Sequence, residues 1–438
     1  MKRRTFVGAM VAATGAATTG TMAAQSGKPV RETVLKGDYW GPQFYGAEER
    51  EQLMEVLETG RPFRWYGRGD QPPMKVATFE KEFAARMQTK YALAVTSGTA
   101  ALEAAIAALR IGPGDEVIIP AWTWHSSASC VIRAGALPVF AEIDESFNLD
   151  PNDIERRITP QTKMIMAVHL QGCPADMDRI IPIARKHNIK LLEDCAQSVG
   201  GSYKGKPLGS MGDISIFSHQ LNKTISAGEG GSVITNDPVL FERAARFHDL
   251  GGLRGLHQDI IGKAALEPFA GGANFRMTEF TGGVLLAQLR KLDKIVGSVR
   301  ANSKRVREGI QDLPGIRFRQ VPDPDGDIGT GVFIRFDSKA KRSRFMAAMK
   351  AENVPVAAPG GSVVLPVLPY IEKKLTLHAA WPTWTTGRGK TIKYGAASCP
   401  KTLDVLDRFA GPLIDPKYTK KDTDDIIAAV RKVYPTIG

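Results

Sequence analysis

The chain has 438 residues, of which 43% are hydrophobic and 24% are charged, and its formal net charge is +12 at pH 7. This composition is that of an ordinary globular protein, and the length exceeds that of a single hydrophobic core, which predicts two domains. The basic residues are scattered, and no arginine-rich run alternates with aromatic residues. We therefore expect no nucleic-acid partner, and the positive charge is interpreted as solvated surface that also favours anionic substrates.

The first residues resemble an export signal. Residues 2–4 read Lys-Arg-Arg, a weakly apolar stretch rich in Gly, Ala and Thr extends to Gly20, and small residues follow. This order is typical of a cleavable signal, and the paired arginines followed by Phe6 resemble the twin-arginine type. The apolar stretch is too short to span a bilayer, so no stable membrane anchor is expected. We predict that residues 1–27 direct export to the periplasm or another extracytoplasmic space; the alternative is a disordered basic tail on a cytoplasmic protein.

The four cysteines are far apart and form no C-x-x-C pair. Their spacing predicts neither a structural zinc site nor a disulfide framework, and no metal is expected.

From about residue 91, short β-rich runs alternate with helical stretches. Strands are expected at 92–95, 116–119, 137–140, 164–168, 189–192, 214–217 and 232–235. Helices are expected between several of them, at 99–109, 126–134 and 176–187. This rhythm predicts an α/β fold with βαβ units and a mainly parallel sheet between helices. Active sites in such sheets lie beyond the carboxyl ends of the strands.

A smaller α+β domain is expected to follow. A long helical pattern from 276 to about 307 leads into it, and further elements are predicted: strands at 315–318 and 331–336, and helices at 342–352 and 422–433. An early helix at 48–57 is expected to pack against this domain. The segment 360–393, rich in Pro, Gly and Trp, is interpreted as an irregular substrate-facing loop. We thus predict an N-terminal segment with a large domain over 28–294, and a small domain over 295–438.

Two charged residues indicate pyridoxal 5′-phosphate (PLP) chemistry. Lys223 lies in the run Asn-Lys-Thr-Ile-Ser-Ala-Gly-Glu-Gly-Gly, and the pair Glu193-Asp194 follows an apolar run that ends at Leu192. PLP chemistry needs a lysine that condenses with an aldehyde and an acid that keeps a pyridine nitrogen protonated. One lysine and one aspartate mean little alone, so the surrounding residues decide.

Two upstream segments suit the same cofactor. The turn Ser97-Gly98-Thr99-Ala100 follows a strand and begins a helix, where free N–H groups and small hydroxyls form an anion site. The alternative for this turn is an ordinary Ser/Thr N-cap. Trp124 follows the next strand and can stack on a flat ring, although a tryptophan is more often core packing.

Blocks of sequence then occur in a recognisable order. They are Ser-Gly-Thr-Ala-Ala-Leu (97–102), Pro-x-x-Thr-Trp (120–124), Gly-Ala-x-Pro-Val-Phe (135–140), Glu-Asp-x-Ala-Gln (193–197), Gly-Asp-Ile-x-x-Phe-Ser (212–218), Lys-x-x-x-x-Gly-Glu-Gly-Gly (223–231) and Asn-Phe-Arg-Met-Thr-Glu-Phe (274–280). From about residue 40 to the C-terminus the chain closely resembles the DegT/DnrJ/EryC1/StrS family. These are fold-type I PLP enzymes, mostly sugar aminotransferases.

The resemblance implies a catalytic pair and a cofactor site. Lys223 matches the lysine that forms the aldimine with PLP, and Asp194 matches the acid paired with the pyridine nitrogen. The other matched residues contact the cofactor in the family: Gln197 near the ring hydroxyl, Trp124 stacked on the ring, and Gly98, Thr99 and Ser218 at the phosphate. Asn274 matches a residue donated to the neighbouring subunit's phosphate, which implies a homodimer with shared active sites.

The expected activity is PLP-dependent transamination from Glu or Gln to a keto-sugar or keto-cyclitol, with Lys223 also moving a proton. The blocks at 274–280 and 399–404 resemble the branch that contains scyllo-inosose-type aminotransferases. Trp381, Trp384 and His378 are expected to line the acceptor pocket, with core packing as the alternative.

Two other functions are weighed against transamination. In the sugar-dehydratase branch a histidine replaces the lysine, whereas this chain retains Lys223, and His219 lies four residues earlier. A non-catalytic binding or regulatory protein is the third reading, and the joint retention of Lys223, Asp194, Gln197 and Trp124 speaks against it.

Overall fold

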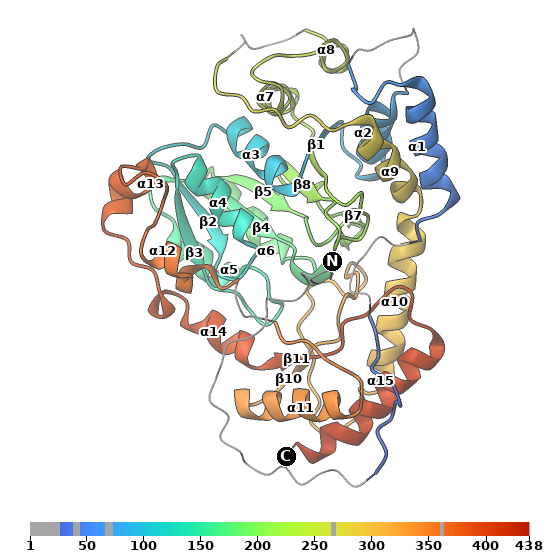
Figure 1. The fold of residues 1–438 in the computed structure, drawn as a ribbon. Helices are drawn as coiled ribbons and strands as arrows, with labels where there is room; N and C mark the ends of the chain where they lie inside the picture. The colour runs from blue at the N-terminus through green and yellow to red at the C-terminus, as the bar shows by residue number, and fades with distance from the viewer. Residues whose placement is uncertain (1–26, 38–43, 66–72, 264–268, 360–362, 438) are drawn as a thin grey trace, which may run out of the picture.

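A seven-stranded sheet forms the centre of the molecule. The computed structural model describes residues 27–37, 44–65, 73–263, 269–359 and 363–437. The strand order is β1-β9-β8-β5-β4-β2-β3 (Figure 1). The strands are β1 (Tyr91–Val95), β2 (Glu116–Pro120), β3 (Leu137–Ala141), β4 (Thr162–Val168), β5 (Lys190–Asp194), β8 (Ile214–Ser218) and β9 (Gly231–Thr235). Strands β2, β3, β4, β5 and β8 pair in parallel, and β9 runs antiparallel to both β8 and β1. The predicted mainly parallel sheet is confirmed.

Helices cover both faces of the sheet. Successive strand residues point to opposite sides, so each strand contributes residues to a core on either face. In β1, Leu93 and Val95 join the core under α3, α4 and α7, whereas Ala92 and Ala94 join the core with α2, α6 and α9. This two-sided burial explains why the strands read as nearly continuous apolar runs. The helices of this part are α2 (Lys75–Arg86), α3 (Gly98–Ala108), α4 (His125–Arg133), α5 (Pro151–Arg157), α6 (Met177–Lys186), α7 (Pro238–His248), α8 (Gly255–Ile261) and α9 (Glu279–Arg290). A short 3₁₀ helix η1 (Leu170–Gly172) follows β4, and a small hairpin joins β6 (Ser202–Tyr203) to β7 (Lys206–Pro207).

Two sequence predictions about helices are wrong. The single helix predicted over 276–307 is divided at Lys291 into α9 and α10 (Leu292–Glu308). The early helix, α1 (Ala47–Thr59), packs along α9 and not against the smaller domain (Figure 1). Lys291, the residue between α9 and α10, also contacts α1: its ammonium lies 2.7 Å from a Glu49 carboxylate oxygen. Periodicity identifies a helix, but the partner that the helix packs against is a long-range contact.

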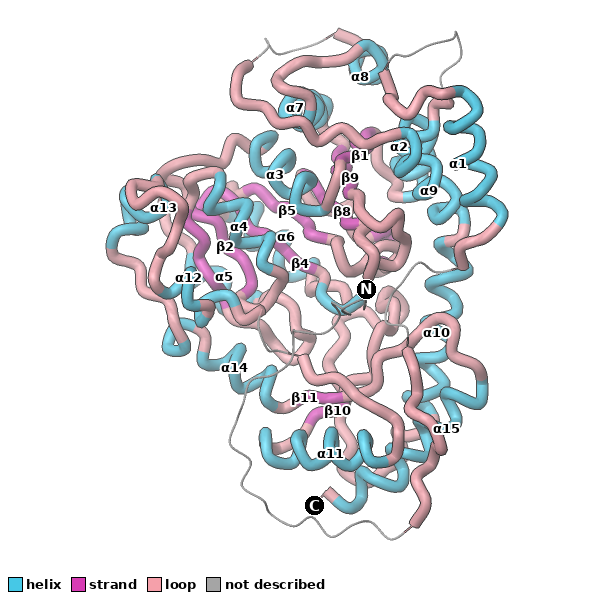
Figure 2. The backbone as a smooth tube through the Cα atoms, in the orientation of Figure 1, coloured by secondary structure: helices cyan, strands magenta, loops and turns pink. Residues whose placement is uncertain are grey.

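In the C-terminal part, helices and long loops surround one short pair of strands (Figure 2). Its elements are β10 (Ile334–Arg335), α11 (Lys339–Ala351), α12 (Pro369–Glu372), α13 (Pro382–Thr385), α14 (Pro400–Asp407), β11 (Phe409–Ala410) and α15 (Lys420–Val433), together with the 3₁₀ helices η2 (Leu365–Val367), η3 (Gly387–Lys390), η4 (Ala396–Ser398) and η5 (Tyr434–Thr436). The strand predicted at 315–318 is reduced to a single bridge between Phe318 and Ile334, and the one predicted at 331–336 shortens to β10. The predicted domain boundary at residue 294 stays a prediction.

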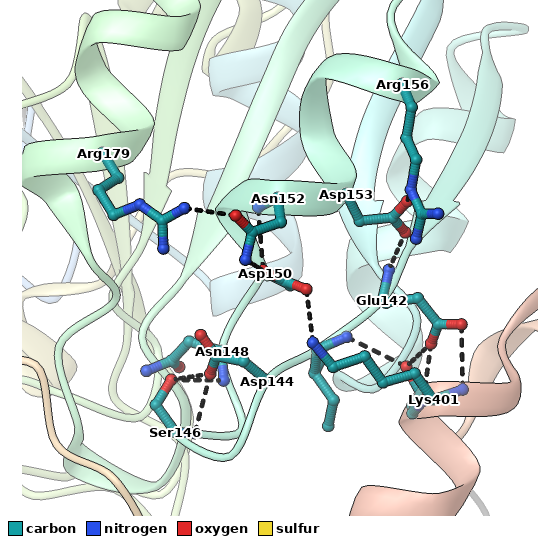
Figure 3. A network of polar contacts seen from close by, with 12 residues as sticks. Glu142, Asp144, Ser146, Asn148, Asp150, Asn152, Asp153, Arg156, Arg179 and Lys401 are labelled. Atoms are coloured by element: carbon teal, nitrogen blue, oxygen red, sulfur yellow. Dashed lines mark hydrogen bonds and ion pairs between the residues drawn. The ribbon is translucent and has the colours of Figure 1, made fainter.

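A polar network after β3 anchors α14 to the sheet (Figure 3). Glu142 accepts hydrogen bonds from the backbone N–H groups of Lys401 and Thr402, at 3.1 and 2.7 Å, and so caps the first turn of α14. The Lys401 ammonium pairs with Asp150 at 2.6 Å. Carboxylates stabilise helix N-termini by meeting free N–H groups and the positive end of the helix dipole. The sequence block at 399–404 therefore has a structural role.

The predicted export signal, apart from residue 27, lies outside the described residues. Among the helices of the described ranges, none combines the length and the apolar character needed to cross a membrane.

Candidate active site

The carboxyl ends of β1, β2, β4, β5 and β8 lie at one edge of the sheet, and a cavity of about 590 Å³ opens there. All predicted site residues except Asn274 line this cavity: Gly98, Thr99, Trp124, Asp194, Gln197, Ser218 and Lys223. They come from separate strand ends, so only the parallel sheet brings them together.

Lys223 lies on the loop that joins β8 to β9. The backbone N–H of Leu221 donates to the Gly228 carbonyl at 2.9 Å, and that of Lys223 donates to the Gln220 carbonyl at 3.0 Å, which fixes the loop. The Lys223 ammonium makes no ion pair with any other described residue. Burial lowers the pKa of Lys223, and the Asp194 carboxylate opposes this shift. More of the amine is thus neutral at a given pH than in an exposed lysine, as a nucleophile or base requires.

Asp194 is the last residue of β5 and is only 3% exposed. One carboxylate oxygen accepts from the Ala196 N–H at 3.0 Å, and the other from the Ser127 hydroxyl at 3.4 Å. Burial raises the pKa of Asp194, while the Ala196 N–H and the charge of Lys223 act in the opposite direction. A buried carboxylate of this kind is stabilised by a cationic hydrogen-bond donor in the cavity. A protonated pyridine nitrogen is such a donor, so this residue fits PLP.

The neighbouring Glu193 points to the other side of β5, and both oxygens of its carboxylate already accept hydrogen bonds. His169 accepts from the Ala175 N–H through Nδ1 at 3.0 Å, so its Nε2 carries the proton and donates to Glu193 at 3.1 Å. The remaining capacity of Glu193 accepts the N–H groups of Gly209, Met211 and Gly212. His169, Glu193 and Cys195 lie close enough to hold a metal, but these hydrogen bonds already use the electron pairs that His169 and Glu193 would offer it.

The turn before α3 has features of both structures predicted for it, an N-cap and an anion site. The Ser97 hydroxyl accepts from the Ala100 N–H at 3.0 Å, and Ser97 is therefore an N-cap. The Thr99 hydroxyl lies 2.7 Å from that of Ser126, and both residues line the cavity together with Gly98. The first N–H groups of a helix lack intrahelical partners, and hydroxyls beside them suit a phosphate.

Gly98 allows α3 to approach β8 closely. A Cβ atom at residue 98 would lie 2.7 Å from the Ser218 Cβ and 3.3 Å from the Ser218 Cα, so the backbone would have to shift. We expect Gly98→Ala to weaken PLP binding on the order of tenfold and to cost about 1–3 kcal/mol of stability, because overpacking separates the two phosphate-binding elements. Titration of the apoprotein with PLP checks this.

Gly297→Ala is the matched control, because a Cβ there meets nothing within 4 Å on α10. This substitution should leave PLP affinity unchanged. Equal PLP affinities for Gly98→Ala and Gly297→Ala would contradict the packing argument.

Trp124 and Gln197 present groups suited to an aromatic ring. The Trp124 side chain is 55% exposed, and its indole meets the His125 ring edge-on at 5.1 Å, which leaves a face free for stacking. Gln197 accepts the Gln171 backbone N–H through Oε1 at 3.0 Å. An N–H can only donate, so this contact fixes the amide orientation and leaves the Gln197 NH₂ as a donor.

Some predicted residues lie elsewhere. Asn274 is exposed and bridges to Asp249, away from the cavity lining. The prediction that Trp381, Trp384 and His378 line the pocket is wrong, since none of them does so. The Trp381 indole N–H donates to the Ile132 carbonyl of α4 at 2.6 Å, and the buried Trp384 packs edge-on against Tyr394. These tryptophans pack against their neighbours.

Sequence reasoning missed three cavity residues that organise the site: Ser127, Gln171 and Thr330. Gln171 follows β4, so the expectation of active-site residues after parallel strands could have found it. Thr330 is distant in sequence and lies in no motif, so nothing local marks it.

A model of the DegT/DnrJ/EryC1/StrS aminotransferase family matches residues 45–359. This chain belongs to that family. The predicted family and enzyme class, a PLP-dependent aminotransferase, are thereby confirmed.

The chain is also similar to named proteins and to solved structures. The spore coat polysaccharide biosynthesis protein SpsC of Bacillus subtilis is 33% identical over 89% of this chain and 95% of its own length. The L-glutamine:2-deoxy-scyllo-inosose aminotransferase of Micromonospora echinospora is 37% identical over 69% of this chain and 71% of its own length. The crystal structure of 3-amino-5-hydroxybenzoic acid synthase superposes with a TM-score of 0.73 and 27% identity, covering 94% of this chain and 100% of that one. The predicted fold-type I architecture is confirmed.

Proposed function

We propose that this chain uses PLP to move an amino group from Glu or Gln to a keto-sugar or keto-cyclitol. The observation that carries the proposal is the meeting of Lys223, Asp194 and the free face of Trp124 in one cavity. PLP, when bound, supplies the electron sink that makes an α-proton of the amino donor removable. Lys223 would hold the cofactor and, once released, carry that proton as a base.

The other residues would bind and orient the cofactor. Asp194 would accept the pyridine N–H, Gln197 would donate its NH₂ to the ring hydroxyl, and Trp124 would stack on the ring. Gly98, Thr99 and Ser218 would hold the phosphate at the α3 N-terminus. We also propose that the chain forms a homodimer in which Asn274, exposed at the surface, completes the phosphate site of the partner subunit.

The environment of His219 supports transamination over sugar dehydration. His219 is fully buried, packs edge-on against Phe79 and Phe83, and lies 2.8 Å from the Ser232 hydroxyl through Nε2. Burial lowers the pKa of His219 to about 3, so it stays neutral. This histidine has a core role and is absent from the cavity lining.

The names of relatives suggest the substrates. One relative uses L-glutamine and 2-deoxy-scyllo-inosose, and another makes GDP-perosamine. We propose a hydroxyl-rich ketone as acceptor and L-glutamine or L-glutamate as donor for this chain.

Two half-reactions test the proposal. Holoenzyme mixed with L-glutamine or L-glutamate should lose the visible absorption of protein-bound PLP, and 2-deoxy-scyllo-inosose should restore it. GDP-perosamine with 2-oxoglutarate tests the nucleotide-linked alternative in reverse. A band that no amino donor changes would favour a binding protein and overturn the proposal.

We further propose that residues 1–27 export the folded protein by a twin-arginine route. The double substitution of Arg3 and Arg4 by lysine keeps the positive charge but removes the pair that a receptor would read. We expect this variant to accumulate in the cytoplasm, as measured by fractionation and immunoblotting. A Lys2→Arg variant serves as control, and an unchanged distribution of the double variant would support the basic-tail reading.

A further inference from the structure

Gln171 occupies an unusual backbone position at the cavity. Its φ and ψ are 54° and 40°, in the left-handed region that is unfavourable for a residue other than glycine. In this conformation both the backbone N–H and the backbone carbonyl of Gln171 make hydrogen bonds to side chains. Its N–H meets Gln197 at 3.0 Å, and its carbonyl accepts the Thr330 hydroxyl at 2.7 Å.

The contact with Thr330 joins the C-terminal part to the cofactor side of the cavity. Thr330 is buried, and its own carbonyl accepts the Ile414 N–H at 2.9 Å, which fixes its backbone. The next residue after Gln171, Gly172, has φ 76°, and a Cβ there would lie 2.7 Å from the Thr330 Cγ2. The two segments are therefore in tight contact, and the backbone of Gln171 is held by Gln197 at its N–H and by Thr330 at its carbonyl.

The Gln171 side chain has a free carboxamide. Gln171 lines the cavity, and its side chain makes no hydrogen bond with any other described residue. Residues of the C-terminal part, including Ala358, Pro359 and Val363, also line this cavity. Gln171 is therefore adjacent to the proposed cofactor residue Gln197 and lines the same cavity.

The chemistry of a carboxamide favours one kind of partner. It offers two donors and an acceptor without charge, which matches a hydroxyl that can both donate and accept. A carboxylate, in contrast, is bound best by charged donors such as arginine. We propose that Gln171 binds a hydroxyl of the amino acceptor and that Thr330 holds Gln171 in position; this rests on the proposed transamination.

Gln171→Met tests the contact. Methionine has a similar length and the same backbone cost, but it lacks the amide. With 2-deoxy-scyllo-inosose as acceptor, or GDP-perosamine in reverse if only that is used, we expect the KM for this substrate to rise about three- to tenfold, the equivalent of one neutral hydrogen bond. The KM for L-glutamine or L-glutamate, measured in the donor half-reaction of the same holoenzyme, should change less than about twofold.

Thr330 variants test the positioning role. Thr330→Val removes the hydroxyl and should raise the same acceptor KM, whereas Thr330→Ser restores the donor atom and should reverse that rise. If Thr330 acts through Gln171, Thr330→Val should have no further effect on acceptor KM in the Gln171→Met background.

The outcomes separate the two proposals. A wild-type enzyme that turns over neither acceptor would contradict the proposed function. Wild-type turnover with an unchanged acceptor KM in Gln171→Met, or with an equal rise for donor and acceptor, would contradict the role of Gln171 alone.

Discussion

Replacement of Lys223 by alanine is expected to abolish transamination and the covalent attachment of PLP. The lost base alone lowers the rate by on the order of 10²–10⁴-fold, and loss of the covalent anchor adds to this. The measurement is the steady-state rate with L-glutamine, together with borohydride reduction of the holoenzyme and mass spectrometry of the labelled peptide. The wild-type label should map to Lys223.

A surface lysine provides the control. Lys163 is exposed and donates to the Pro160 carbonyl at 3.2 Å, outside the cavity lining. Lys163→Ala should retain both rate and label. Because burial lowers the pKa of Lys223, PLP should attach to it at pH values at which exposed lysines remain protonated. A Lys223→Ala enzyme with near wild-type rate would show that another group does this chemistry.

Asp194→Asn is expected to lower the rate on the order of 10²–10⁴-fold while PLP remains detectable on the protein. The amide keeps the size of the carboxylate and can still accept from the Ala196 N–H, but it removes the charge that would face the pyridinium. Loss of one partner of a buried charge pair costs about 3–5 kcal/mol, which sets this range. Asp178→Asn, at an exposed ion pair with Lys204, is the matched control.

Acidification separates the role of Asp194 from general damage. Burial raises the pKa of Asp194, so in the apoprotein it takes up a proton at a higher pH than an exposed aspartate does. PLP affinity should therefore fall as pH decreases through that range in the wild type, and the Asn variant should lack this component. The same pH dependence in both proteins would mean that Asp194 does not face the cofactor.

Much of the large domain was predictable because its signals are local. Strands buried on both faces leave apolar runs, as at Leu93 and Val95, and the intervening helices repeat with their own period. The residues that the family shares follow these strands in order, so Lys223 and Asp194 could be identified without coordinates. The apolar runs at 315–318 and 331–336 carry the same local signal, yet they form only the bridge between Phe318 and Ile334 and the two-residue strand β10, because strand length depends on long-range pairing.

The sequence by itself determined the family, the strand order along the chain and the chemical groups for PLP. Only the tertiary structure decided which residues meet. In the structure α1 packs on α9, Trp381 and Trp384 lie outside the cavity lining, and Thr330 contacts Gln171. These contacts join segments far apart in the chain, and their geometry depends on packing that no local pattern encodes.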